Sequence, residues 1–259
     1  RDDRANHSSC TTLEVPEEAC PPSNIDPESI RNALSTWVSG LPVPEKPNEW
    51  EVKQLLKAIG ISVPNGVILP AGADSEDRVA AVKDQLHFPC VVKVCSGEII
   101  HKTELGGVRT HVSEKKLPET IRALRAAFPD ACLLIEEMVR YDGYEFILGI
   151  IDDSTFGPAI MAGAGGILTE LYKDVSFRLA PCSVTEARRM LQELRIAPVL
   201  TGYRNIHMDI DALSEIIEVI GVLANEFALG GNQLDINPIV WSEGQWVVLD
   251  AKTVILNPL

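Results

Sequence analysis

Segments of helical and strand-like apolar spacing follow one another along the chain, which predicts a protein that mixes both elements. Helices are predicted at 30–38, 49–59, 77–86, 117–127, 183–194 and 211–227. Short apolar runs bounded by turn residues predict strands at 67–69, 90–94, 108–111, 131–139, 145–151 and 159–162. Two further runs, around 234–238 and 249–252, are joined by Ser242-Glu243-Gly244 and predict a hairpin.

The first 45 residues differ in composition from the rest. Residues 1–26 are rich in Ser, Thr, Pro, Glu and Asn and hold few large apolar residues, which is typical of a flexible tail or a linker. The helical pattern over 30–38 follows Asp26-Pro27, a typical helix start, and prolines then interrupt the chain. We therefore expect residues 1–45 to be a linker or tail with one short helix.

A His-Lys pair and a Gly-Gly turn follow directly on the predicted strand at 90–94. Glycines such as Gly106 and Gly107 let backbone amides approach anionic oxygens closely, and a lysine neutralises phosphate charge. A neutral imidazole such as that of His101 can attack a phosphoryl group. The same residues also fit an ordinary loop histidine beside a turn that needs glycine, so both interpretations stay open on spacing alone.

The predicted hairpin near the end carries three polar side chains, Asp235, Asn237 and Asp250. Residues two apart on a strand share a face, so Asp235 and Asn237 point the same way and Asp250 can lie opposite them. Mg²⁺ takes one or two carboxylate-type ligands and completes its shell with phosphates and water. The alternative is a hairpin whose polar side chains merely face solvent.

Together these segments resemble the ATP-grasp domain of ADP-forming acyl-CoA synthetases (acetate–CoA ligases), the beta subunit or beta-like part of enzymes related to succinyl-CoA synthetase. The resemblance runs from about residue 50 to about residue 255. Its motifs are Leu55-Leu56-Lys57-Ala58-Ile59-Gly60-Ile61, Val92-Lys93-Val94, Ile100-His101-Lys102, Gly106-Gly107-Val108, Phe156-Gly157-Pro158, Lys173-Asp174-Val175-Ser176-Phe177-Arg178 and Asp235-Ile236-Asn237-Pro238. It implies an α/β (α+β) ATP-grasp fold, with a small lobe over 46–130 and a large lobe over 131–259 gripping a nucleotide.

The resemblance also implies a set of nucleotide-contacting residues. The phosphates would meet Lys93, Gly106 and Gly107, the adenine hinge would be Glu136, Glu137 and Val139, the ribose would meet Glu145, and Asp235 would belong to the same site. Asn237 and Asp250 would hold magnesium, and His101 would become a phosphohistidine.

The reaction implied by the resemblance is reversible: acid, CoA and ATP give acyl-CoA, ADP and phosphate through acyl phosphate and phosphohistidine. We find no CoA-binding nucleotide fold in the chain, so we expect a CoA-binding alpha partner. That partner would be a separate subunit or the rest of a fused chain, giving a hetero-oligomer or a homodimer of fused chains.

Two other readings of the same fold stay open. One is a regulatory ATP-grasp-like module of the kind fused to protein acetyltransferases. The other is an ATP-grasp carboxylate ligase that forms amides without phosphohistidine. His101 favours the acyl-CoA synthetase, because neither alternative requires it.

The loop that carries His101 departs from the family pattern. The family usually has a Pro-Asp pair where this chain has Gly97-Glu98, and an Asp where it has Glu104. The charge is kept. Glycine in place of proline is expected to loosen the entry to the loop.

Composition narrows the class of protein further. A net charge of −14, with 23 basic against 37 acidic residues, argues against nucleic-acid binding, which needs clustered Lys and Arg. The six cysteines form no CxxC pair, so structural thiols in a reducing cytoplasm are expected. No run of about 18 apolar residues predicts a membrane span.

Three further residues have specific expectations. His87 lies at a predicted helix end, which favours a C-terminal cap. Asp174 and Arg178 lie four apart on one strand, so an internal ion pair and a contact with phosphate or a partner both remain open.

Overall fold

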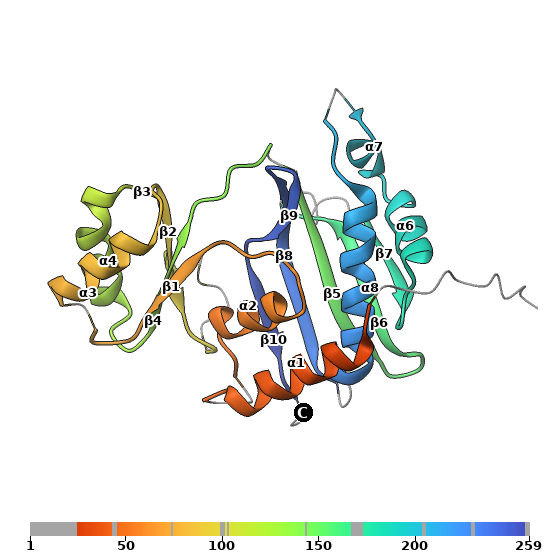
Figure 1. Cartoon of the computed structure of the whole chain (residues 1–259), viewed down its shortest axis with the longest axis horizontal. Helices are drawn as coiled ribbons and strands as arrows, with labels where there is room; N and C mark the ends of the chain where they lie inside the picture. The colour runs from red at the N-terminus through yellow and green to blue at the C-terminus, as the bar shows by residue number, and fades with distance from the viewer. Residues whose placement is uncertain are drawn as a thin grey trace, which may run out of the picture.

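The computed structural model describes residues 25–42, 46–73, 75–98, 102, 104–142, 144–166, 173–203, 206–228 and 231–256. They form two lobes, each built on its own antiparallel sheet with its own hydrophobic core (Figure 1). The small lobe lies on the left of Figure 1 and the large lobe on the right. The predicted tail at 1–24 lies outside the described residues.

The small lobe is a four-stranded sheet in the order β1-β4-β2-β3, covered by helices. Its strands are β1 (Gly66–Leu69), β2 (Cys90–Cys95), β3 (Val108–Val112) and β4 (Cys132–Glu137). Its helices are α3 (Glu76–Gln85), the short 3-10 helix η1 (Glu114–Lys116) and α4 (Leu117–Ala127). Val92 and Val94 of β2 share one core with Ile121 and Leu124 of α4, so the apolar face of this helix covers one face of the sheet.

The large lobe is a six-stranded sheet in the order β10-β8-β5-β6-β7, with β9 paired to β8. Its strands are β5 (Glu145–Asp153), β6 (Gly157–Ala164), β7 (Val175–Leu179), β8 (Gln233–Ser242), β9 (Gln245–Val248) and β10 (Ala251–Val254). Its helices are α1 (Pro27–Gly40), α2 (Glu49–Ala58), α6 (Val184–Gln192), α7 (Ala197–Leu200) and α8 (Ile210–Phe227). The predicted apolar stripe of α8 is confirmed, because Leu213, Ile217, Ile220 and Leu223 are fully buried.

Local signals in the sequence fix where the helices begin and end. Asn48 and Glu51 form a capping box at the start of α2, each side chain accepting from the other's backbone amide. Ser183 caps α6 by accepting from the amide of Glu186. Gly60 adopts φ +86° after α2, the left-handed conformation expected of a C-terminal glycine.

Two segments lie in a different lobe from the one predicted. The strand at 131–139 was assigned to the large lobe, but β4 pairs with β1 and β2 in the middle of the small-lobe sheet. Helix α2, assigned to the small lobe, buries Val52, Leu55 and Leu56 in the large-lobe core. An apolar pattern shows that an element is buried, and only its packing partners decide in which core. The small lobe is thus inserted between two parts of the large lobe.

The four cysteines within the described residues fit structural thiols. Cys90, Cys95 and Cys182 are buried, and Cys132 is half-buried. Burial raises the pKa of Cys90 to about 11 and that of Cys95 to about 12, so both stay protonated at neutral pH. In the part of the chain that the structure describes, no helix is both long and apolar enough to cross a bilayer.

Candidate functional site

Charged side chains from both lobes form one cluster where the lobes meet. We call it the ion cluster, and its members are Glu49, Lys53, Lys93, Lys102, Glu136 and Asp250. Glu49 and Lys53 lie on α2, Lys93 lies on β2, and Glu136 lies on β4. Lys102 lies in the segment after β2, and Asp250 lies in the link between β9 and β10. The cluster therefore ties the small lobe to the large lobe.

Two lysines at the centre of the cluster donate to the same three groups, which are the carboxylates of Glu49 and Glu136 and the carbonyl of Leu249. The Lys93 Nζ lies 2.7 Å from Glu49 Oε1, 2.8 Å from Glu136 Oε2 and 2.7 Å from the Leu249 carbonyl oxygen. The Lys53 Nζ lies 2.8 Å from Glu49 Oε1, 2.6 Å from Glu136 Oε1 and 2.7 Å from the same carbonyl. An ammonium group has three donors, so each lysine is fully satisfied although both are buried.

The third lysine, Lys102, lies at the edge of the cluster. Its Nζ is 2.8 Å from Asp250 Oδ2 and also contacts Glu49 Oε2. Its side chain is 12% exposed and that of Asp250 is 29% exposed, so this edge is the part of the cluster that solvent reaches. Three lysines face three carboxylates, and the formal charges balance.

The surroundings of the cluster set its protonation. Burial alone would raise the pKa of Glu49, but the three lysines outweigh it and hold that pKa well below its usual range. Burial alone would lower the pKa of Lys93, but the carboxylates of the cluster raise it well above its usual value. Burial raises the pKa of Asp250, and the neighbouring charge of Glu49 adds to the shift. At neutral pH Lys93 and Glu49 are therefore both charged.

The predicted adenine hinge is largely occupied by contacts within the protein. The backbone amide of Glu137 donates to the Asn65 carbonyl at 2.9 Å, and that of Met138 donates to the Pro89 carbonyl at 3.1 Å. The Glu136 side chain belongs to the ion cluster. The carboxylate of Glu137 accepts from His87, whose predicted role as a helix cap is therefore wrong. Val139 lies just beyond these paired amides and is half-buried.

Glu145, predicted to meet a ribose, lies beside a glycine turn. Its Oε1 accepts from the Tyr141 hydroxyl at 2.6 Å, and its carbonyl accepts from the Gly165 amide at 2.6 Å. Burial and this carboxylate raise the pKa of Tyr141 to about 12. Gly166 has φ +62°, and a side chain there would collide with the Glu145 carboxylate. These glycines thus make room for Glu145.

The Gly106-Gly107 turn is closed by backbone contacts. The Gly107 amide donates to the Lys102 carbonyl at 2.6 Å, and the Gly107 carbonyl accepts from Val94 at 2.8 Å. Gly106 has φ +71°, so the turn requires glycine there. The turn holds Lys102 against the end of β2. His101 lies outside the described residues, and its predicted role stays a prediction.

The final hairpin forms as predicted, and it brings two of its three polar residues together. The Asn237 amide donates to the Asp250 carbonyl at 3.0 Å, so these two residues lie opposite each other. Asp235 instead lies opposite Lys252, and their side chains are 3.1 Å apart. Asn237 is exposed and Asp250 is half-buried.

The pair of Asn237 and Asp250 fits a magnesium site that phosphate oxygens complete. Both offer hard oxygen atoms, and Mg²⁺ in nucleotide sites uses one or two carboxylates together with substrate phosphates. Among the residues that the structure describes, no group of three or more His, Cys, Asp or Glu side chains could hold a metal alone. This donor set therefore suits a metal that arrives with its nucleotide.

Glu49, Lys53 and Lys102 were not among the predicted site residues. Glu49 and Lys53 are four apart on a helix, a spacing typical of exposed ion pairs. Their signal was their place within the apolar stripe of α2, next to Val52 and Leu56, where exposed charges do not belong. Lys102 was considered only as the lysine of the His-Lys pair, where it could neutralise phosphate charge.

Asp174 and Arg178 do not form the internal ion pair considered from the sequence. The Asp174 carboxylate accepts from the backbone amides of Arg195 and Ile196 at 2.8 and 2.9 Å. The Arg178 guanidinium pairs with Glu193 at 2.6 Å. Both residues therefore have structural partners in the segment around α6.

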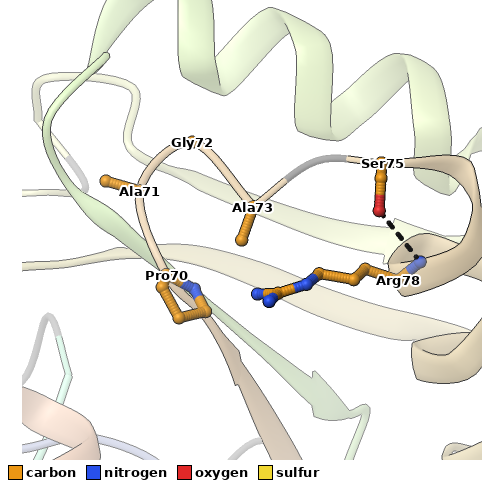
Figure 2. Close-up of a pocket in the computed structure, with 6 residues that line it drawn as sticks. All are labelled: Pro70, Ala71, Gly72, Ala73, Ser75 and Arg78. Carbon is orange, nitrogen blue, oxygen red and sulfur yellow. Dashed lines mark hydrogen bonds between the residues drawn. The ribbon is translucent and has the colours of Figure 1, made fainter.

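Figure 2 shows a surface hollow on the small lobe, and none of its lining residues belongs to the ion cluster. It lies between the end of β1 and the start of α3, and its lining residues are Pro70, Ala71, Gly72, Ala73, Ser75 and Arg78. Ser75 accepts from the Arg78 amide, which caps α3. None of the predicted site residues lines this hollow.

The two sheets, the lysine and carboxylate side chains between them and the hairpin carboxylate define an ATP-grasp domain. A family model of an ATP-grasp domain matches residues 45–255. The beta subunit of ADP-forming acetate–CoA ligase I from Pyrococcus furiosus is 37% identical over 216 residues, which cover 80% of this chain and 90% of that subunit. The chain therefore belongs to the ATP-grasp domains of ADP-forming acyl-CoA synthetases, as the sequence resemblance implied.

Of two further relatives, one is a longer protein and the other is a solved structure with bound ligands. ADP-forming acetate–CoA ligase I from Archaeoglobus fulgidus is 33% identical over 210 residues, which cover 78% of this chain but only 30% of that longer protein. A solved structure of dinucleotide-forming acetyl-CoA synthetase 1 from Ca. Korarchaeum cryptofilum superposes with a TM-score of 0.70 at 29% identity, covering 88% of this chain and 100% of that chain. That structure holds coenzyme A and Mg-AMPPCP, with its phosphohistidine segment pointing towards the nucleotide site.

Proposed function

We propose that this chain is the nucleotide-binding part of an ADP-forming acid–CoA ligase. The observation that carries the proposal is the 37% identity that extends over 90% of a beta subunit of this activity. The convergence of Lys93, Lys102 and Asp250 at the junction of the lobes supports it, because nucleotide phosphates need both cations and a metal carboxylate.

The proposed step at this chain is reversible phosphoryl transfer to His101. An imidazole nitrogen attacks the γ-phosphorus of ATP, the bond from that phosphorus to the bridging oxygen breaks, and ADP leaves. In the second half, a substrate carboxylate oxygen takes the phosphoryl group from His101 and becomes an acyl phosphate. The CoA thiolate then displaces phosphate and forms the thioester.

Binding the phosphates requires the ion cluster to exchange partners. Lys93 and Lys102 exchange carboxylate contacts for contacts with phosphate oxygens, while Glu49 keeps the buried Lys53 paired. Asn237 and Asp250 would hold Mg²⁺, which would neutralise charge on the phosphate oxygens. Catalysis here consists of positioning and charge neutralisation, since phosphoryl transfer asks little else of the protein.

The base and sugar contacts follow from the groups that remain available. The amides of Glu137 and Met138 are used within the protein, so the adenine contact at the hinge falls to the backbone of Val139. Glu145, held by Tyr141, accepts a hydrogen bond from a ribose hydroxyl. Gly106 and Gly107 supply a turn without side chains beside the phosphates.

The other half of the reaction belongs to a partner. Relatives of this chain occur as separate beta subunits and as parts of longer chains. We propose that CoA is bound mainly by an alpha partner or by fused alpha-like domains.

The test is phosphoenzyme formation from γ-labelled ATP with Mg²⁺, with and without an alpha partner. Acid-labile, base-stable label is expected on the wild-type chain and should be lost in His101→Asn. His111→Asn is the matched control, because His111 is exposed on β3 and asparagine tolerates its positive φ of 55°. Label that persists in His101→Asn would refute the phosphohistidine assignment. Nucleotide binding without any label, even with an active partner, would favour a regulatory module or another ATP-grasp ligase.

A further inference from the structure

Asp250 is already occupied by a cation that belongs to the chain itself. The Lys102 Nζ lies 2.8 Å from Asp250 Oδ2 and 3.0 Å from Asp250 Oδ1, so the ammonium group spans both carboxylate oxygens. This carboxylate is also the group that would hold a magnesium ion in the proposed function. The ammonium group of Lys102 therefore occupies the carboxylate that the metal would need.

Lys102 is held in this position from two other directions. Its Nζ contacts Glu49 Oε2, and its carbonyl accepts from the Gly107 amide at 2.6 Å. The Gly107 turn leaves no room for a side chain, because a Cβ there would lie 2.9 Å from the Lys102 carbonyl oxygen. The backbone position of Lys102 is therefore fixed beside the end of β2.

We propose that Lys102 and the magnesium ion compete for the carboxylate of Asp250. Lys102 is a positioning residue that occupies the metal-binding carboxylate until Mg²⁺ and its nucleotide replace it. This inference rests on the proposed function, since it requires Asp250 to be a metal ligand. It adds a built-in cation to the metal site and gives Lys102 a role before the nucleotide binds.

The competition has a direction that binding measurements can detect. If Lys102 occupies Asp250, removing its charge makes the carboxylate available and raises metal affinity. If Lys102 only helps to bind phosphates, removing it lowers affinity for the metal–nucleotide complex. A lysine that is a bystander changes neither. These three possibilities predict different signs.

The experiment measures the binding of Mg²⁺ and Mn²⁺ to the whole 259-residue chain. Calorimetry follows both metals and electron paramagnetic resonance follows Mn²⁺, each with and without AMPPCP. Without AMPPCP, Lys102→Gln and Lys102→Met are expected to bind the metal about tenfold more tightly, which corresponds to about 1.4 kcal/mol. With AMPPCP the gain should be smaller, because the variants also lose a phosphate contact. Lys102→Arg keeps the charge and should stay near the wild-type affinity. Thermal unfolding of each variant checks that the fold is retained.

Lys252→Gln is the matched control for net charge. Lys252 lies two residues from Asp250 but pairs with Asp235. A general effect of removing positive charge would raise affinity equally in Lys252→Gln and Lys102→Gln, and that result would overturn the proposal. Unchanged or weaker binding of the metal alone, without AMPPCP, in both the Gln and the Met variants of Lys102 would also overturn it.

Asp250→Asn separates this inference from the proposed function. Loss of metal binding in Asp250→Asn together with tighter binding in Lys102→Gln supports both. Loss of metal binding in Asp250→Asn with no gain in Lys102→Gln refutes the competition and leaves the metal site in place. Unaltered metal binding in Asp250→Asn refutes the metal site, and the competition with it.

Discussion

Glu49 contacts three lysines through a single carboxylate, which makes it the acidic centre of the ion cluster. Replacing a buried charge while its partners remain leaves them uncompensated, at a cost of about 3 kcal/mol or more. The family motifs pointed to Lys93 and Asp250, because their neighbours along the chain form recognisable patterns. They could not point to Glu49, because two of its three lysine partners are 44 and 53 residues away.

Glu49→Gln should lower the free energy of unfolding by about 3 kcal/mol at pH 7. Because the pKa of Glu49 is lowered in the folded state, its stabilisation is fully present above the ordinary glutamate pKa of about 4.3. It is lost as the pH falls from there through the lowered pKa. The difference between wild type and variant in urea unfolding should therefore shrink below about pH 4.

Glu98→Gln is the control for this measurement. Glu98 also pairs with a lysine, Lys46, but its side chain is 74% exposed. Solvent screens an exposed pair and leaves it little effect on stability, so this variant should stay close to wild type. If Glu49→Gln unfolded no more easily than Glu98→Gln at pH 7, the cluster would not depend on Glu49.

Gly97, which follows β2, lies against the backbone of Lys46. A Cβ at this position would collide with the carbonyl oxygen of Lys46, so the close approach of the two backbones requires glycine. The sequence predicted that glycine in place of the family's proline loosens this entry. The contact adds a constraint that no local pattern signals, because Lys46 lies on a distant part of the chain.

Gly97→Ala should lower the free energy of unfolding by about 1–3 kcal/mol through this overlap. Gly40→Ala is the matched control, since a Cβ at the end of α1 meets nothing within 4 Å. Differential scanning calorimetry of both variants checks the expectation. Equal midpoints for the two alanine variants would mean that the segment relaxes away from Lys46 at no cost.

Element identities followed from the sequence more fully than their assembly did. The helices at 27–40, 49–58 and 210–227 and the final hairpin lie where periodicity and turn residues predicted them. The placement of β4 and α2 did not follow, because both are apolar enough for either core. Sheet pairing and helix packing over long sequence separations decide such choices, and spacing within a segment carries no record of them.

A nucleotide bound between the lobes should stabilise both of them. At a concentration 100 times the Kd, a ligand that binds only the folded chain adds about 2.7 kcal/mol to the free energy of unfolding. We expect ADP with Mg²⁺ to raise the unfolding midpoint, and EDTA to remove most of the gain. Asp250→Asn should abolish the dependence on Mg²⁺. An equal shift with and without the metal would argue against a metal role for this hairpin.

The insertion of the small lobe into the large lobe has a consequence for the order in which the protein is made. Helices α1 and α2 are synthesised before the small lobe, yet the strands that complete their core, β8 and β10, end only at Val254. The small lobe, complete by Glu137, has all its strands available long before then. During synthesis the small lobe can therefore fold before the large lobe. At that stage α2, with Glu49 and Lys53, does not yet have the strands of the large lobe to pack against.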